Sequence, residues 1–421
     1  MKIIKNNKIH LSVLVVLFSI IFMACDDLFK VDNPNYVEDS NVTSQEFIGI
    51  LGDSPEGNLS RFYSTAVIVA GMPSDEVMAQ QTSQGGDNMV DIGVFEDNLP
   101  YTDNPFNNLS QARWVATDAS KRLEELVDNP ATSIELAKSY FWDGIARTTL
   151  ADMYEGVPLD NGPIVSPIDT YVTAINLFEK SAAIFKAIAT DLSTTYEAAA
   201  YTSIARVYRT LYFERGQDNN SLIQAEDYAK KALQVNPEFK LEIVYDPPGT
   251  QNALYTSLNQ GSYIKMDPVF ANRVDPVSGD LDPRIQHGSL LGLSNLRGDE
   301  VYHQLKYTSE SASVPVSRWQ EAELILAEYE VLLGTPSNAV LHINNVRNAA
   351  GLPDFASAVP SEIHEQIKYE RATEFWLELR RWQDMRYYNI IPDTWIPAEA
   401  AKGVDRRFPI STRERDANPN F

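Results

Sequence analysis

The sequence predicts a mostly α-helical domain, made of imperfect helix pairs with long irregular loop insertions. Three observations support this all-α class. From residue 107 onward, apolar residues recur at intervals of three and four, the period of an amphipathic helix. By contrast, turn-forming residues fill 71–106 and 238–317 without a clear period. Apolar residues make up 44% of the chain, which is ample for a packed core.

The first 24 residues are predicted to be a secretory signal and not part of the fold. A basic start with Lys2, Lys5 and Lys8 precedes a mostly apolar run at 11–24. A helix that spans a bilayer needs roughly 20 apolar residues, so this run is short for a stable span. The signal is therefore expected to be removed.

Cys25, the only cysteine, follows the apolar run directly. This position resembles the lipobox of bacterial lipoproteins, although Phe22 stands where the lipobox usually has Leu. The resemblance implies a lipid attached to Cys25 and a polar tether over 25–45. The alternative is a small buried thiol.

The net charge of −23 argues against nucleic acid as a partner, because such an anion repels phosphate backbones. With Cys25 acylated, no thiol remains for a disulfide, a zinc site or a nucleophile. The five histidines show no HExxH or other ligand spacing. The acids in 275–284 lack the EF-hand order, so solvated loop acids are favoured over calcium. No cofactor and no metal are predicted.

Residues 46–421 are predicted to form a single helical domain. Helices are expected at 46–70, 107–126, 134–154, 171–189, 196–212, 225–235, 318–334, 336–350 and 367–390. The segment from Ala225 to Pro237 resembles the second helix of a tetratricopeptide repeat with its closing proline. A second helix pair is expected at 318–334 and 336–350. It is separated from the first by far more than one repeat length, so the repeats are few and interrupted.

The two irregular regions, 71–106 and 238–317, are the expected binding regions, since loops on a rigid scaffold often carry function. They contain aromatic residues whose rings suit the faces of sugars or peptide side chains. We select as candidate ligand-binding residues Phe95, Tyr101, Phe106, Tyr263 and Tyr302. For any single ring, the commoner role is to anchor its loop to the helices.

The predicted helix at 367–390 carries many charges. Glu374 and Glu378 lie four apart, Arg381 follows Glu378 by three, and Asp384 follows Arg380 by four, so opposite charges are expected to pair along the helix. Two carboxylates on one face suggest a glycosidase pair. Nearby arginines would keep both acids ionised, however, and a structural charge network is favoured over catalysis.

Four features spread along the chain match one family. They are Cys25-Asp26-Asp27-Leu28-Phe29 with Asn33-Pro34, the helix RWQEAELILAE at 318–328, INNVRNAAGL at 343–352, and ERATEFWLELRRWQD at 370–384. In these features the chain resembles the SusD/RagB outer-membrane lipoproteins of Bacteroidota. It departs from the family pattern at Ala349, where Arg is usual, and at Leu379, where Gly is usual.

The resemblance implies a noncatalytic, surface-exposed lipoprotein of the outer membrane. Such a protein captures a nutrient ligand and delivers it to a TonB-dependent, SusC-like transporter barrel, over which it acts as a lid. We expect an oligosaccharide rather than a peptide, with the irregular regions closing over it. Two alternatives are a tetratricopeptide-type scaffold that binds only protein, and a surface glycosidase using Glu374 and Glu378.

Overall fold

The computed structural model describes residues 42, 44–82 and 85–421. The predicted signal at 1–24, Cys25 and most of the tether at 25–45 lie outside these residues. The chain divides into two compact units, Met1–Phe47 and Ile48–Phe421. The described part of the first unit contains the short 3-10 helix η2 (Gln45–Phe47). The second unit holds the remaining elements.

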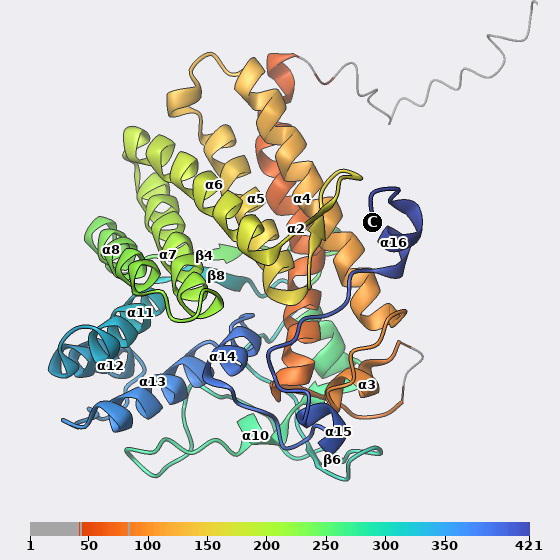
Figure 1. The fold of residues 1–421 in the computed structure, drawn as a ribbon, viewed down its shortest axis with the longest axis vertical. Coiled ribbons are helices and arrows are strands. Elements are labelled where there is room, and N and C mark those ends of the chain that lie inside the picture. The colour runs from red at the N-terminus through yellow and green to blue at the C-terminus, as the bar shows by residue number, and fades with distance from the viewer. Residues whose placement is uncertain (1–41, 43, 83–84) are drawn as a thin grey trace, which may run out of the picture. The chain divides into compact units, whose positions relative to one another are not determined.

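The second unit is an array of antiparallel helices, as Figure 1 shows. Each helix packs against the next in chain order through the first half of the unit. These helices are α2 (Ile48–Gly71), α4 (Pro100–Leu126), α5 (Ile134–Met153), α6 (Pro167–Ile188), α7 (Asp191–Glu214) and α8 (Asn219–Val235). The predicted helical periods are confirmed here, and so is the all-α class.

The second half of the array continues from α8 despite the long insertion after it. Helix α11 (Trp319–Leu332) packs on α8, and α12 (Pro336–Ala349) and α13 (Pro360–Glu374) pack on α11. Strands β4 (Lys240–Ile243) and β8 (Val314–Arg318) pair antiparallel at the two ends of the insertion. This pairing brings α8 and α11 together, so helix pairs far apart in sequence become neighbours.

Small residues allow the close approach of these helices. Ala225, Ala229 and Ala232 of α8 are fully buried, as the repeat-like pattern predicts. A second buried cluster, where α11, α12 and α13 meet, contains Ala327, Ala339, Ile343, Ile363 and Ile367. Side-chain caps fix several helix starts, for example Ser133, which accepts a hydrogen bond from the Leu136 amide.

Short elements fill the rest of the second unit. The strands form two-stranded antiparallel sheets: β1 (Val77–Ala79) with β5 (Ile264–Met266), β2 (Val157–Pro158) with β3 (Ile164–Val165), and β6 (Gly292–Leu293) with β7 (Glu300–Val301). The short helices are η3 (Met72–Ser74), α3 (Asp87–Asp91), η4 (Pro130–Thr132), α9 (Ala253–Tyr255), α10 (Pro268–Ala271), α14 (Arg381–Tyr388), α15 (Pro397–Ala400) and α16 (Thr412–Ala417), with a π-helical turn, η5, at Thr256–Gln260.

The prediction of a surface loop over 71–106 is wrong for much of that segment. Residues 71–79 are buried, and Pro100 starts α4 seven residues earlier than the periodicity indicates. Proline suits the first helical position because it has no N–H to leave unbonded there. The buried carboxylate of Glu76 has a hydrogen-bond partner 301 residues away in the sequence. Its Oε1 accepts a hydrogen bond from the Leu377 amide at 2.7 Å.

The predicted continuous helix at 367–390 is also wrong. It breaks between α13 and α14, where Leu377 and Leu379 adopt left-handed φ values of 56° and 61°. Because of this break, the expected Arg380–Asp384 pair does not form. Arg380 instead binds Glu321, with Nε 2.8 Å from Oε1, and Asp384 binds Arg209 on α7 at 2.8 Å.

Among the described residues, no helix combines the length and the apolar character needed to cross a membrane.

Candidate functional site

The two irregular regions fold into one surface. Beyond the β1–β5 pair, the Gln80 amide donates to the Tyr263 carbonyl at 2.7 Å. The Gln80 carbonyl then accepts the Asn295 amide at 3.1 Å and the Ser294 hydroxyl at 3.2 Å. Three segments far apart in sequence therefore meet at Gln80. We call the residues 80–82, 262–264 and 286–305 the loop surface.

A partly buried ion cluster connects the loop surface to neighbouring segments. The Arg297 guanidinium lies 3.2 Å from Asp91 on α3, 3.0 Å from Asp267 and 2.6 Å from Asp299. Asp267 is fully buried. Burial raises the pKa of Asp91 to about 7, and Arg297 opposes that rise. The cluster fixes the 286–305 segment to both irregular regions.

The structure gives most of the candidate rings packing roles. Phe95 sits among aromatic rings, with its centroid 5.2 Å from both Trp382 and Phe408. Phe106 is 1% exposed, and the Tyr101 hydroxyl donates to the Ile68 carbonyl at 3.4 Å. These three rings anchor the first irregular region to the helices, the commoner role weighed for each ring from the sequence.

The two candidate rings of the second irregular region lie on the loop surface and differ in exposure. Tyr302 is buried; its hydroxyl donates to Glu300 at 2.6 Å and its ring meets His287 at 4.7 Å. Tyr263 is 50% exposed and presents its ring to solvent. Tyr263 is thus the candidate ring available to a ligand, and its contact with one stays a prediction.

Periodicity and motif searches missed other exposed groups on the loop surface. Leucine side chains of the β6–β7 region are exposed, namely Leu290, Leu291, Leu293 and Leu296. Beside them, the Gln80 Oε1 is buried without a hydrogen-bond partner among the described residues. The run of leucines in 290–296 is visible in the sequence, but nothing in its spacing indicates that it faces solvent. The exposed aromatic ring and apolar side chains suit the face of a sugar or the side chains of a peptide.

The carboxylates considered for glycosidase chemistry lie in a different place. Glu378 accepts from Arg318 at 2.9 Å and from Lys306 at 2.6 Å, and Glu374 pairs with the same arginine. Burial alone would raise the pKa of Glu378, but Arg318 and Lys306 outweigh it and lower the pKa below its ordinary value. A glycosidase needs one carboxyl with a raised pKa as its acid. Glu378, whose pKa is lowered, does not provide one.

Two of the three acids in 275–284 also bind arginines. Asp275 binds Arg347, with Oδ1 2.9 Å from Nη1, and Asp282 binds Arg284 at 2.8 Å. Over the described residues, no three His, Cys, Asp or Glu side chains gather in a way that could hold a metal ion.

Comparison with known proteins shows what this chain is similar to. Residues 295–420 match the model of the SusD family. A search of curated proteins found no match. Among solved structures, a SusD superfamily protein from Bacteroides vulgatus aligns with a TM-score of 0.70 at 16% identity, covering 90% of this chain and 98% of its own. A SusD homolog from Bacteroides thetaiotaomicron gives 0.69 at 13% identity, covering 93% and 98%.

A third structure, described as a SusD-like carbohydrate binding protein from Bacteroides vulgatus, aligns with a TM-score of 0.62 at 14% identity, covering 82% of this chain and 84% of its own. The family match covers the C-terminal part of the chain, and these solved structures share its fold.

Proposed function

We propose that this protein captures a nutrient glycan at the loop surface and delivers it to a TonB-dependent, SusC-like transporter in the outer membrane. The observation that carries the proposal is the meeting of both irregular regions around Gln80, which leaves the Tyr263 ring exposed. A flat exposed ring is complementary to the apolar face of a sugar. The solved relative described as carbohydrate binding supports a glycan over a peptide.

The ligand class is tested by binding of the mature chain to arrays of glycans and peptides. A glycan should be retained, and Tyr263→Ala should weaken its binding about tenfold, because truncating an aromatic anchor costs about 1–2 kcal/mol. Trp114→Ala is the matched control, since Trp114 is 51% exposed on α4, outside the loop surface. Retention of peptides alone would contradict the glycan assignment, and no retention on either array would favour the protein-binding scaffold.

The anchor and the partner belong to the same proposal. Cys25 is the proposed lipid-attachment residue, which places the protein on the cell surface at the outer membrane. Cys25→Ser should abolish metabolic labelling with a fatty acid and release the protein from the membrane fraction. Crosslinking in cells followed by purification should recover a large barrel protein. Recovery of no such partner would contradict the delivery role while leaving ligand capture in place.

A further inference from the structure

Buried acids outnumber the cations around them where the two irregular regions meet. Asp75 follows η3, Asp91 ends α3 and Asp267 caps α10, and all three are buried. Figure 1 shows α3 and α10 at the same end of the second unit as β6. Among the described residues, Arg297 is the one cation within ion-pair distance of Asp91 and Asp267. We call Asp75, Asp91, Asp267 and Arg297 the acid junction.

The distances from Arg297 differ between the three acids that it contacts. Its Nε lies 2.6 Å from Asp299, whose side chain is 38% exposed. Its Nη1 lies 3.2 and 3.4 Å from the two carboxyl oxygens of Asp91. Its Nη2 lies 3.0 Å from Asp267 Oδ2, an oxygen with no hydrogen-bond partner among the described residues. Contacts between an ionised guanidinium and an ionised carboxylate are typically about 2.7–2.9 Å, so the longer distances fit two buried acids that share one counter-charge.

The groups that face the junction from neighbouring elements do not correct this imbalance. They are Glu76, Tyr101, Asp299, Lys306, Arg381 and Asp384. Arg381 is shared between Asp75 and two further acids of this set, and Lys306 is bound to Glu378 at 2.6 Å. Tyr101 is neutral, because burial raises its pKa well above the ordinary value. Negative groups therefore outnumber counter-charges at the junction.

Protonation removes the excess charge. Burial raises the pKa of Asp91 to about 7; Arg297 opposes this rise and Asp267 adds to it. Burial also raises the pKa of Asp75 to about 6, and it raises the pKa of Asp267. Because these pKa values lie above the ordinary value of about 4, the stability that the protonated junction contributes is present below about pH 4 and is lost as the pH rises through 6–7.

The junction holds a segment that has few other contacts with the first irregular region. In the described chain, the remaining polar contacts between 294–299 and that region are the hydrogen bonds from Ser294 and Asn295 to the Gln80 carbonyl. Leu296 and the neighbouring Leu293 are exposed, so burial of apolar surface adds little. Segments held by few buried contacts are the ones that open locally.

We propose that the acid junction is a pH-sensitive switch that attaches residues 294–299 to the first irregular region in mild acid and releases them as the pH rises. On release a proton passes to the solvent, the buried carboxylates become hydrated, and their mutual repulsion is relieved. The shape of the loop surface therefore depends on pH. The consequence for ligand capture rests on the function proposed above: capture is favoured in mild acid over mild alkali.

Hydrogen–deuterium exchange of the mature chain without ligand tests the switch at pH 5, 6, 7 and 8, with each rate corrected for the intrinsic pH dependence of amide exchange. One released proton raises the opening constant up to tenfold per pH unit between the pKa values of the open and closed forms. Exchange of the amides in 294–299 should therefore rise at least tenfold from pH 5 to pH 7. It should be faster than exchange in α8 at every pH, because the opening is local.

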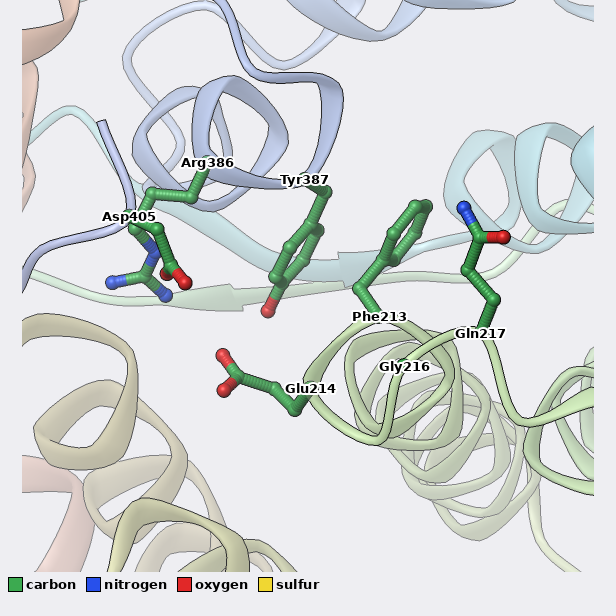
Figure 2. A pocket seen from close by; sticks show the side chains of 7 residues that line it. All are labelled: Phe213, Glu214, Gly216, Gln217, Arg386, Tyr387 and Asp405. Carbon is green, nitrogen blue, oxygen red and sulfur yellow. The ribbon is translucent and has the colours of Figure 1, made fainter. Parts of the chain in front are cut away.

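Asp91→Asn provides the decisive variant, since the amide has the shape of the carboxyl group and stays neutral. Exchange of 294–299 in this variant at pH 8 should approach the rate of the unchanged protein at pH 5. Asp75→Asn should remove part of the pH dependence and gives the same test if Asp91→Asn does not fold. Asp405→Asn is the matched control, because Asp405 is an exposed acid at a separate place, the hollow between α7 and α14 that Figure 2 shows. It should keep the full pH dependence.

Equal corrected exchange of 294–299 at pH 5 and pH 8 would overturn the proposal. Exchange of 294–299 no faster than that of α8 would also overturn it, since the segment would then open only with the whole fold. Undiminished pH dependence in both Asp91→Asn and Asp75→Asn would assign the effect to other groups and have the same result. Because no ligand is present, none of these outcomes bears on glycan capture, which the arrays test separately.

Discussion

The contact between Arg347 and the loop insertion gives the sharpest stability prediction. Arg347 is fully buried; it binds Asp275 through Nη1 at 2.9 Å and Nη2 at 3.0 Å, and Glu370 through Nη1 at 2.7 Å. In Arg347→Met, Glu370 keeps hydrogen bonds of 2.6 Å from both Arg284 and Gln366. Among the described residues, Asp275 keeps its hydrogen bonds from Ser278, including the Ser278 amide at 2.9 Å. One buried carboxylate loses its counter-charge.

Removing one partner of a buried ion pair costs about 3–5 kcal/mol. Because only Asp275 is left uncompensated, we expect Arg347→Met to lower the free energy of unfolding by about 3 kcal/mol at pH 7, the low end of that range. Urea unfolding followed by circular dichroism measures this change. Arg415→Met is the matched control: Arg415 binds Asp97 through two contacts of 2.9 Å at an exposed site, and its loss should cost under about 1 kcal/mol.

The pH dependence provides a second readout of the same change. Burial alone would raise the pKa of Asp275, but hydrogen bonds from Arg347 and Ser278 outweigh it and hold the pKa at about 2. The wild-type contribution is therefore present above the unfolded pKa of about 4 and is lost as the pH falls toward 2. In Arg347→Met the pKa of Asp275 should rise, so the variant gains stability as the pH falls from 7 to 4.5.

The stability gap between wild type and Arg347→Met should therefore narrow at pH 4.5, and Arg347→Met/Asp275→Asn should recover part of the loss at pH 7. If Arg347→Met lowers the free energy of unfolding at pH 7 by no more than Arg415→Met does, the reasoning is refuted. A gap that does not change with pH would also refute it.

The remaining predictions concern the whole fold and its helix packing. Burial raises the pKa of Asp75 to about 6 and those of Glu76 and Asp91 to about 7. Because these pKa values are above the unfolded values, the contribution of the three acids to stability is present below about pH 4 and is lost as the pH rises through 6–7. Thermal unfolding should therefore give a higher midpoint at pH 5 than at pH 8. Gly144→Ala should destabilise the fold by about 1–3 kcal/mol, because the new Cβ would lie 2.6 Å from a ring carbon of α6. Gly57→Ala in α2 should instead stabilise it by about 0.5–1 kcal/mol, since nothing lies within 4 Å; denaturant unfolding of both variants checks the pair.

The helical array could be predicted from the sequence because its signal is local. The apolar period marks each helix, and the alanines at 225, 229 and 232 mark the close packing of α8. The burial of 71–79 could not be predicted in this way. Asp75 and Glu76 make the segment look exposed, and the group that satisfies Glu76, the Leu377 amide, lies 301 residues further on.

One residue in the sequence could have indicated the break between α13 and α14. Leu379 stands where the family pattern has glycine, and it adopts a left-handed φ of 61°. Glycine takes this conformation without strain, so the family's preference for glycine reflects the backbone conformation rather than packing.

The sequence alone could not show which candidate rings are buried and which are exposed. Turn-forming residues precede both Phe106 and Tyr263 in the sequence, and only the long-range fold buries the first at 1% exposure and leaves the second at 50%.

The ion pairs bear on how a ligand would be held. From the sequence we expected the irregular regions to close over it. The structure instead ties the second region to the helical array through the buried pair Arg347–Asp275, and to the first region through Arg297. Breaking a buried pair costs about 3–5 kcal/mol, so a closing motion that separated them would be strongly opposed. Binding to a preformed loop surface, with movement of the whole domain relative to a partner, agrees better with this arrangement.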